Sequence, residues 1–261
     1  MPYSRRAAIY DIEYIENRDV DFVSRLICDT EARVLEVPCG AGRLSVALAQ
    51  RTRHLTIVDI EPAMVERAME AVTRVGRETY VTGHVGDMRA LALGRCFDLV
   101  VIPREALQLL RPEEGKRALA AAASHVLPGG RLVLDLATFG TRTDEVQDPD
   151  YFDPSRVNDA WQVDWSRPLK DGSILTRQSL QHQGTAGIRL DFRYERRRAS
   201  GDIESWTSEM FLHRYDQSWI EGNIPENLQL EAIYGNYDRS IFIDTAPRMI
   251  ALYKCVLDTS R

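Results

Sequence analysis

The chain has few of the residues that mark metal-binding, disulfide-rich or nucleic-acid-binding proteins. Its 261 residues include 4 cysteines, none in a CxxC pair, and 5 histidines without ligand spacing. Scattered cysteines predict reduced thiols, and histidines in this pattern predict no metal site. The net charge is −6 and no long Lys/Arg block is present. A nucleic-acid partner is therefore disfavoured.

Long hydrophobic runs are also missing. No segment approaches the about 18 apolar residues of a membrane span, and the N-terminal stretch lacks the apolar core of a signal peptide. We therefore expect a cytoplasmic protein without membrane contact. Hydrophobic residues make up 44% of the chain, which is enough for a substantial core.

The first half of the chain alternates apolar strand segments with helical patterns. Strands are expected at RVLEVP, HLTIVDI, TYVTGHV, CFDLVVIP and RLVLDLAT. Helices are expected between them, and the helix before the fifth strand is expected to end at Pro128, Gly129 and Gly130. Strands separated by helices predict βαβ units, and hence an α/β fold with a parallel sheet.

The pattern changes between Trp161 and Tyr215, where apolar and polar residues alternate and turn residues recur. Period-two segments joined by such turns predict antiparallel strands. LQLEAIYG and RMIALYKCVL are expected to return to the main sheet. The predicted organisation is a helical cover at residues 1–30, a cofactor-binding core at 31–145, a β-rich insertion at 146–225, and the final core strands at 226–261.

The segment VLEVPCGAGRLSVALA, at residues 34–49, combines a glycine turn at the start of a helix with a preceding acid. Gly40 and Gly42 match a dinucleotide-binding turn, but Ser45 stands at its third glycine position, so that fingerprint is incomplete. Glu36 would repel a pyrophosphate by about 4 kcal/mol at 4 Å for an effective dielectric constant of 20. The ammonium and sulfonium of S-adenosylmethionine would instead favour this anion. The alternative for Glu36 is a surface salt bridge.

Several motifs occur together in a characteristic order: YDIEY, LEVPCGAGR, VDIEPAM, GDM, FDLVVIP, LPGGRLVLD and PRMIALYKC. In this order and spacing the chain resembles the class I S-adenosylmethionine-dependent methyltransferases. It is most similar to the small-molecule branch that includes glycine N-methyltransferase and bacterial sugar and natural-product N-, O- or C-methyltransferases. The resemblance implies a Rossmann-like sheet with an antiparallel β insertion after strand five. In that branch the insertion roofs the acceptor pocket.

The resemblance also implies roles for individual residues. Glu36 would meet the methionine ammonium, Asp59 the ribose hydroxyls and Asp87 the adenine amino group. The other cofactor-binding residues would be Cys39, Gly40 and Gly42 around the methionine portion, Ile60, Met64 and Met88 beside adenine, and Tyr14 above the cofactor. Tyr10 would lie nearer the transferred methyl group.

These assignments have alternatives that the sequence leaves open. Asp59 would cap the next helix, and Asp87 would be a turn residue. Met64 would belong to the core. Tyr10 and Tyr14 are four residues apart, so they would form a packing stripe on one face of a helix.

Methyl transfer is an in-line displacement that depends mainly on holding the nucleophile near the methyl group. A base is needed only if the acceptor must lose a proton. The segment IPREALQLL is expected to face the methyl group, with Arg104 and Glu105 at its start and Leu109 where relatives often carry a histidine. Glu105 would anchor an acceptor ammonium or take a proton, or else be a first-turn helix acid. His182 and His213 are alternative bases on the insertion.

The sequence thus predicts a methyltransferase that uses S-adenosylmethionine on a small-molecule acceptor in specialised metabolism. An amine nitrogen is favoured as the acceptor atom over oxygen or an electron-rich ring carbon such as that of an indole. The alternatives are a nicotinamide-dependent oxidoreductase and a cofactor-binding protein with an inactive site. The acceptor's identity and a homodimeric state are left open.

Overall fold

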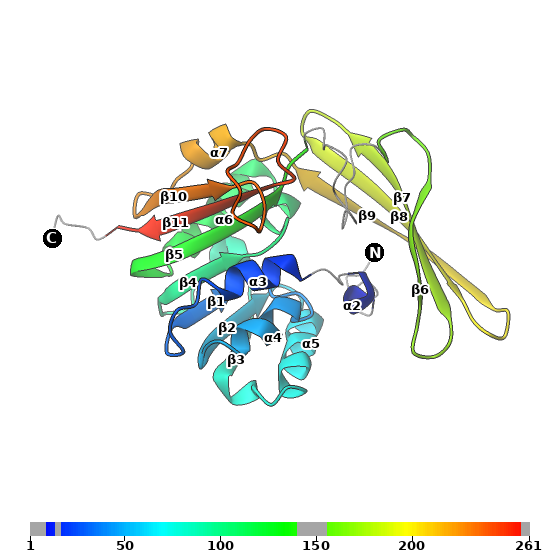
Figure 1. Ribbon diagram of the computed structural model, residues 1–261, viewed down its shortest axis with the longest axis horizontal. Coiled ribbons are helices and arrows are strands. Elements are labelled where there is room, and N and C mark those ends of the chain that lie inside the picture. The colour runs from blue at the N-terminus through cyan, green and yellow to red at the C-terminus, as the bar shows by residue number, and fades with distance from the viewer. Residues whose placement is uncertain (1–8, 14–16, 140–155, 257–261) are drawn as a thin grey trace.

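The computed structural model describes residues 9–13, 17–139 and 156–256. It contains a seven-stranded sheet with helices on both faces and a separate four-stranded sheet (Figure 1). Tyr14 lies outside the described residues.

The larger sheet has the strand order β10-β11-β5-β4-β1-β2-β3. Its strands are β1 (Arg33–Glu36), β2 (His54–Asp59), β3 (Val81–Val85), β4 (Phe97–Ile102), β5 (Val126–Ala137), β10 (Leu228–Tyr234) and β11 (Arg248–Cys255). β1 to β5 run parallel, and β11 pairs antiparallel with both β5 and β10. The expected α/β fold is confirmed, including the return of the two final strands to the main sheet.

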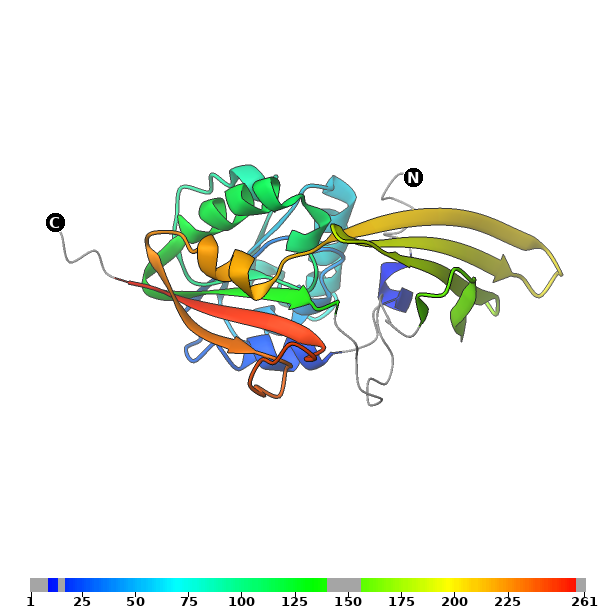
Figure 2. The same cartoon turned by 90° about the horizontal axis from the view of Figure 1, so that it is seen from above.

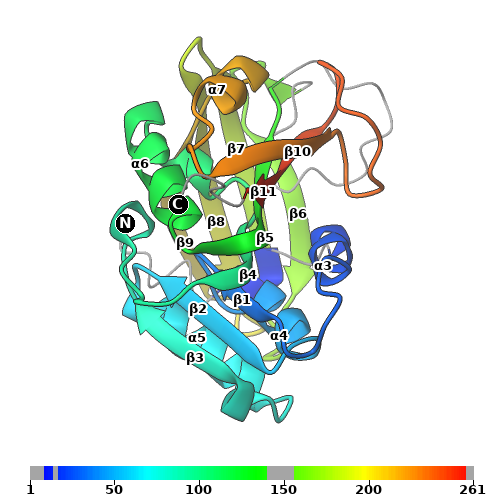
Figure 3. The ribbon, with the colours of Figure 1, turned by 90° about the vertical axis from the view of Figure 1, so that its left-hand side faces the viewer.

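Helices cover both faces of this sheet, because successive strand residues point to opposite sides. Val100 and Ile102 of β4 pack with one cluster, whereas Leu99 and Val101 pack with the other. The helices and short 3-10 turns are α3 (Arg18–Ser24), α4 (Arg43–Ala49), α5 (Pro62–Thr73), η1 (Glu78–Tyr80), η2 (Met88–Ala90), η3 (Leu107–Leu109), α6 (Pro112–Ala123) and α7 (Gln217–Gly222). Figure 3 shows α3 and α4 on one side of the sheet, with α6 and α7 on the other.

The segment Pro128–Gly130 differs from its expected role. It does not end the preceding helix, which stops at Ala123, but lies inside β5. The pairing of β4 with β5 shifts there, between the partners of Phe97 and Leu99. The three residues therefore form an irregularity within the strand, where a Cβ on Gly130 would come 2.9 Å from the Asp98 carbonyl oxygen.

The four-stranded sheet confirms the expected antiparallel strands between Trp161 and Tyr215. It consists of β6 (Gln162–Pro168), β7 (Ile174–Gln183), β8 (Gly187–Arg197) and β9 (Ile203–His213), in that order. Its inner face packs on Ala137 at the end of β5, on Phe139 just after it, and on Ile9 and Ile12 near the N-terminus. The short helix α2 (Tyr10–Glu13) lies between the two sheets in both Figure 1 and Figure 2.

Two further observations concern only the described ranges. No helix in them has the length and apolar character needed to cross a membrane. No three His, Cys, Asp or Glu side chains among these residues are grouped so that they could hold a metal ion.

Candidate functional site

A cavity of about 360 Å³ opens at the carboxyl ends of β1, β2 and β4. In open α/β sheets, ligands bind in the crevice outside these strand ends. Most of the residues expected at the site line it, namely Glu36, Cys39, Gly40, Asp59, Ile60, Met64, Asp87, Met88, Arg104 and Glu105. Tyr10 lies in α2, but its side chain is outside the described part of the structure.

The glycine turn connects β1 to α4 through a left-handed backbone. Gly40 has φ 52° and Gly42 has φ 91°, values that glycine adopts without strain. A Cβ on Gly42 would lie 2.6 Å from the Cα of Ala68 in α5. Gly42 does not line the cavity, but it allows the start of α4 to approach α5 closely.

Glu36, at the end of β1, is 1% exposed. The hydroxyl of Ser45 donates to its Oε2 at 2.6 Å. Burial raises the pKa of Glu36 to about 8, against the opposing effects of Ser45 and Arg43. The surface salt-bridge alternative therefore fails, and Ser45, which breaks the dinucleotide fingerprint, instead supports this carboxyl group. A buried carboxyl on a cavity wall fits a cationic ligand group.

Asp59, at the end of β2, joins the glycine turn to the next helix. Its Oδ2 accepts from the backbone N–H of Gly40 at 2.9 Å, and its Oδ1 accepts from that of Glu61 at 3.0 Å. Burial raises the pKa of Asp59, although these hydrogen bonds act against the shift. The carboxylate thus orients the loop and holds the residue before α5, while it also lines the cavity.

Asp87 caps η2, since its Oδ1 accepts from the backbone N–H of Arg89 at 2.8 Å. The Arg89 guanidinium also binds both oxygens of Asp87, and it reaches Glu114 of α6 at 2.6 Å. This hydrogen bonding lowers the pKa of Asp87. Asp87 is therefore a turn residue, as one of the two interpretations of the sequence had it. Its carboxylate is also fixed at the cavity wall by Arg89, a residue that the sequence analysis missed.

Arg104 and Glu105 follow β4, and both are buried. Arg104 has φ 38°. Oε1 of Glu105 lies 2.7 Å from Nη2 of Arg248, whose Nε donates to Asp135 at 2.7 Å. Tyr237 also donates to Asp135, at 2.8 Å. The charge of Glu105 is thus matched by an arginine that no local pattern links to it, because the fold alone brings β11 beside this loop.

The insertion contributes Met210 and Leu212 of β9 to the cavity wall. Phe211 and His213 alternate with them and point to the other face of the strand. On β7, His182 lies 3.6 Å from Asp191 and 3.2 Å from Asp159. Neither histidine, and no tryptophan, is among the cavity-lining residues in the described ranges. The structure therefore does not support either of these two histidines as a base.

Part of the chain is similar in sequence to known methyltransferases. Residues 34–130 match the family model described as "Methyltransferase domain". The chain is 31% identical over 117 residues to a ubiquinone biosynthesis O-methyltransferase of Xylella fastidiosa. That match covers 43% of this chain and 45% of that protein. The chain thus spans about half the length of the curated relatives it matches.

Solved structures match over almost the whole chain. An S-adenosylmethionine-dependent methyltransferase from Clostridium acetobutylicum has a TM-score of 0.75 at 15% identity, over 98% of this chain and 99% of that chain. The S-adenosylmethionine-bound amino pentose methyltransferase CalS10 from Micromonospora echinaspora has a TM-score of 0.68 at 21% identity, over 95% of each chain. At these identities the likeness shows the fold, and it confirms the Rossmann-like arrangement with the antiparallel insertion.

Proposed function

We propose that this chain, which carries a methyltransferase domain at residues 34–130 and the fold of S-adenosylmethionine-dependent methyltransferases, transfers a methyl group to a small-molecule acceptor. The observation that carries the proposal is Glu36. It is a buried cavity-wall carboxyl with a pKa of about 8, beside a glycine turn that lacks the third glycine of a dinucleotide site. The ammonium of a cationic cofactor would favour the ionised form of this carboxyl group, and the incomplete glycine fingerprint disfavours a dinucleotide.

The residues around the cavity suit each part of this cofactor, whose sulfonium supplies an activated methyl group when bound. Glu36 would hold the methionine ammonium, and the turn at Gly40 would lie beside the methionine portion. Asp59 would accept from the ribose hydroxyls through the lone pairs that its backbone hydrogen bonds leave open. The adenine would lie between Ile60, Met64, Met88 and the Asp87 carboxylate.

The acceptor end of the cavity supports an amine nitrogen as the attacking atom. Beyond the charged residues Arg104 and Glu105, the loop after β4 and strand β9 line the cavity with apolar residues, namely Ala106, Leu109, Leu110, Met210 and Leu212. An apolar wall disfavours an ammonium, so an amine would reach the site neutral and ready to attack without a base. A phenol would need a group to take its proton. The only cavity-lining acid of this segment, within the described residues, is already paired with an arginine.

Specialised metabolism is the biological setting that we propose. CalS10 is described as acting in calicheamicin biosynthesis on an amino pentose. An amino sugar presents the kind of nucleophile that we favour, an amine nitrogen.

The test combines binding with turnover. Isothermal titration is expected to show S-adenosylhomocysteine binding at micromolar affinity or tighter, and no detectable NAD binding. Methyl-labelled S-adenosylmethionine with a panel of amines, phenols and indoles is expected to label an amine. Tight NAD binding without S-adenosylhomocysteine binding would refute the proposal. Binding of S-adenosylhomocysteine without turnover of any acceptor would indicate an inactive cofactor-binding protein.

A further inference from the structure

The inner face of the four-stranded sheet carries a polar stripe along one strand. On β8, the inward residues Ile188, Leu190, Phe192 and Tyr194 belong to a hydrophobic cluster. On the neighbouring strand β7, Arg177, Ser179 and Gln181 point inward, and each is at most 2% exposed. Buried charged groups of this kind are no more stabilising than apolar side chains of similar volume. The stripe therefore suggests a task other than packing.

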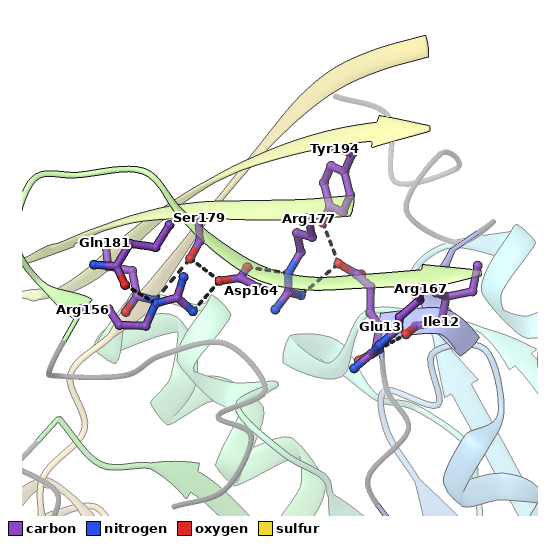
Figure 4. A network of polar contacts seen from close by, with 10 residues as sticks. Ile12, Glu13, Arg156, Asp164, Arg167, Arg177, Ser179, Gln181 and Tyr194 are labelled. Atoms are coloured by element: carbon purple, nitrogen blue, oxygen red, sulfur yellow. Dashed lines mark hydrogen bonds and ion pairs between the residues drawn. The ribbon is translucent and has the colours of Figure 1, made fainter. Parts of the chain in front are cut away.

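The stripe is connected to the N-terminal helix α2 (Figure 4). Nη1 of Arg177 donates to Oε1 of Glu13 at 3.2 Å, and the hydroxyl of Tyr194 donates to the same oxygen at 2.5 Å. The Glu13 side chain is 0% exposed and that of Arg177 is 2% exposed. Two strands of the sheet thus hold one carboxylate that belongs to α2.

The network places opposite charges against one another. Nε of Arg177 donates to Asp164 at 2.7 Å, and Nη1 of Arg156 lies 2.6 Å from the other oxygen of Asp164. The guanidinium group of Arg177 thus bridges the carboxylates of Glu13 and Asp164, and that of Arg156 lies against Asp164 as well. Neutralising one member leaves a buried charge without its counterpart, so the network requires Glu13 in place.

The backbone of α2 is held as well. Arg167 of β6 donates to the carbonyl oxygen of Ile12, and to that of Glu13 at 3.3 Å. Four residues are too few to form a stable isolated helix, and the terminal carbonyls of such a helix need partners. The position of α2 therefore depends on these contacts and on the packing of Ile9 and Ile12 against the sheet.

We propose that Glu13, Arg177 and Tyr194 are positioning residues that dock α2 on the inner face of the four-stranded sheet, so that helix and sheet form one cover over the cofactor cavity. α2 lies between this sheet and the core in both views (Figures 1 and 2), and the same sheet reaches the cavity through Met210 and Leu212. The role as a cover rests on the proposed function, because it assumes that the cavity holds the cofactor. The docking of α2 on the sheet is independent of the proposed function.

The experiment uses the full chain with the variants Glu13→Gln and Tyr194→Phe. Tyr194→Phe removes one donor and leaves all charges in place, so it tests the proposal even if Glu13→Gln fails to fold. Glu195→Gln is the matched control, since Glu195 lies on the same strand in an exposed pair with Arg197 at 3.0 Å. Hydrogen exchange of the peptide that contains residues 9–13 reports docking. Stopped-flow release of S-adenosylhomocysteine reports the cover.

We expect amide exchange in residues 9–13 to rise at least tenfold in Glu13→Gln and severalfold in Tyr194→Phe. Release of S-adenosylhomocysteine is expected to accelerate at least fivefold in Glu13→Gln, whereas Glu195→Gln matches the wild type in both assays. Unchanged exchange in both variants would overturn the docking, and faster exchange with unchanged release would overturn the cover. Failure of the wild type to bind S-adenosylhomocysteine would refute the proposed function and the cover together, while exchange would still decide the docking.

Discussion

At the scale of single residues, Glu36 carries the clearest electrostatic signal. Its pKa of about 8 means that it holds a proton at neutral pH in the free protein. A bound ammonium favours the ionised carboxylate, so binding would release that proton. As pH rises toward 8, ionisation of Glu36 should therefore increase the affinity for the ligand and decrease the stability of the free protein.

We expect the affinity for S-adenosylhomocysteine to rise as pH increases from 6 to about 8, and this rise to vanish in Glu36→Gln. The amide oxygen still accepts from Ser45 but carries no charge to attract an ammonium, so the affinity of Glu36→Gln for the ligand should be at least tenfold lower at pH 8. Titration calorimetry in buffers of different ionisation enthalpy measures the released proton. A pH-independent wild-type affinity would argue against an ammonium at Glu36.

The stability of the free protein tests the same pKa independently. The folded value lies above the ordinary value of 4.5, so this group's contribution to stability is full below about pH 4.5. It is lost as pH rises through about 8. Free Glu36→Gln should therefore be more stable than the wild type at pH 9, as measured by its urea midpoint.

Asp59 combines a structural and a proposed ligand role, and a graded pair of variants separates them. Asp59→Ala loses the hydrogen bonds to Gly40 and Glu61, each worth about 0.5–1.5 kcal/mol. It should lower both the melting temperature and the cofactor affinity. Asp59→Asn keeps one acceptor oxygen and should unfold closer to the wild type.

The ribose contact itself is tested with a modified ligand. Asp59→Asn should weaken S-adenosylhomocysteine at least tenfold, but should change the affinity for its 2′-deoxy analogue much less. Equal losses for both ligands would leave Asp59 with only its loop-holding role.

At the scale of elements, the turn before α4 depends on Gly42. Gly42→Ala combines an unfavourable φ with a Cβ that meets the backbone of Ala68 at 2.6 Å. Gly76 has φ +66° but open space around its Cβ position, so Gly76→Ala isolates the conformational cost of about 1 kcal/mol. Gly42→Ala should lower the free energy of unfolding by at least about 1 kcal/mol more than Gly76→Ala does, because α4 and α5 must move apart. Urea unfolding of both variants gives this difference, and equal costs would show that the contact with α5 relaxes freely.

The alternation along β9 makes a second prediction at this scale. If the proposed function holds, Met210→Ala and Leu212→Ala should change acceptor KM or kcat severalfold, while cofactor affinity stays within about threefold, because these side chains line the cavity from the insertion. Phe211→Ala, on the opposite face, is the matched control and should have little effect. Sedimentation of each variant tests the competing idea that this sheet is an oligomer interface.

At the scale of the whole molecule, the cavity joins parts of the chain that are far apart in sequence, so a ligand there stabilises the entire fold. At a hundredfold excess over its Kd, a ligand adds about 2.7 kcal/mol. For a chain of this size we expect S-adenosylhomocysteine to raise the melting temperature by about 5–10 °C. Differential scanning calorimetry should show no such shift with NAD, and a smaller one for Glu36→Gln at the same ligand concentration.

Local patterns were sufficient for most of the architecture. Period-two and helical patterns predicted both sheets, because they record which face of each element is buried. The residues that line the cavity were predicted from the order of the motifs, since parallel strands place their carboxyl ends at one edge of the sheet. The exception, the segment at Pro128–Gly130, was misplaced because a glycine pair inside a strand has the same signature as a helix end.

What only the tertiary structure decided is which charges meet. The pairing of Glu105 with Arg248, of Arg89 with Glu114, and of Glu13 with Arg177 joins residues whose own segments give no sign of it. Sequence patterns report how each segment divides its side chains between the core and the solvent. The energy of an ion pair depends on distance and burial, and these quantities exist only after folding has brought the segments together.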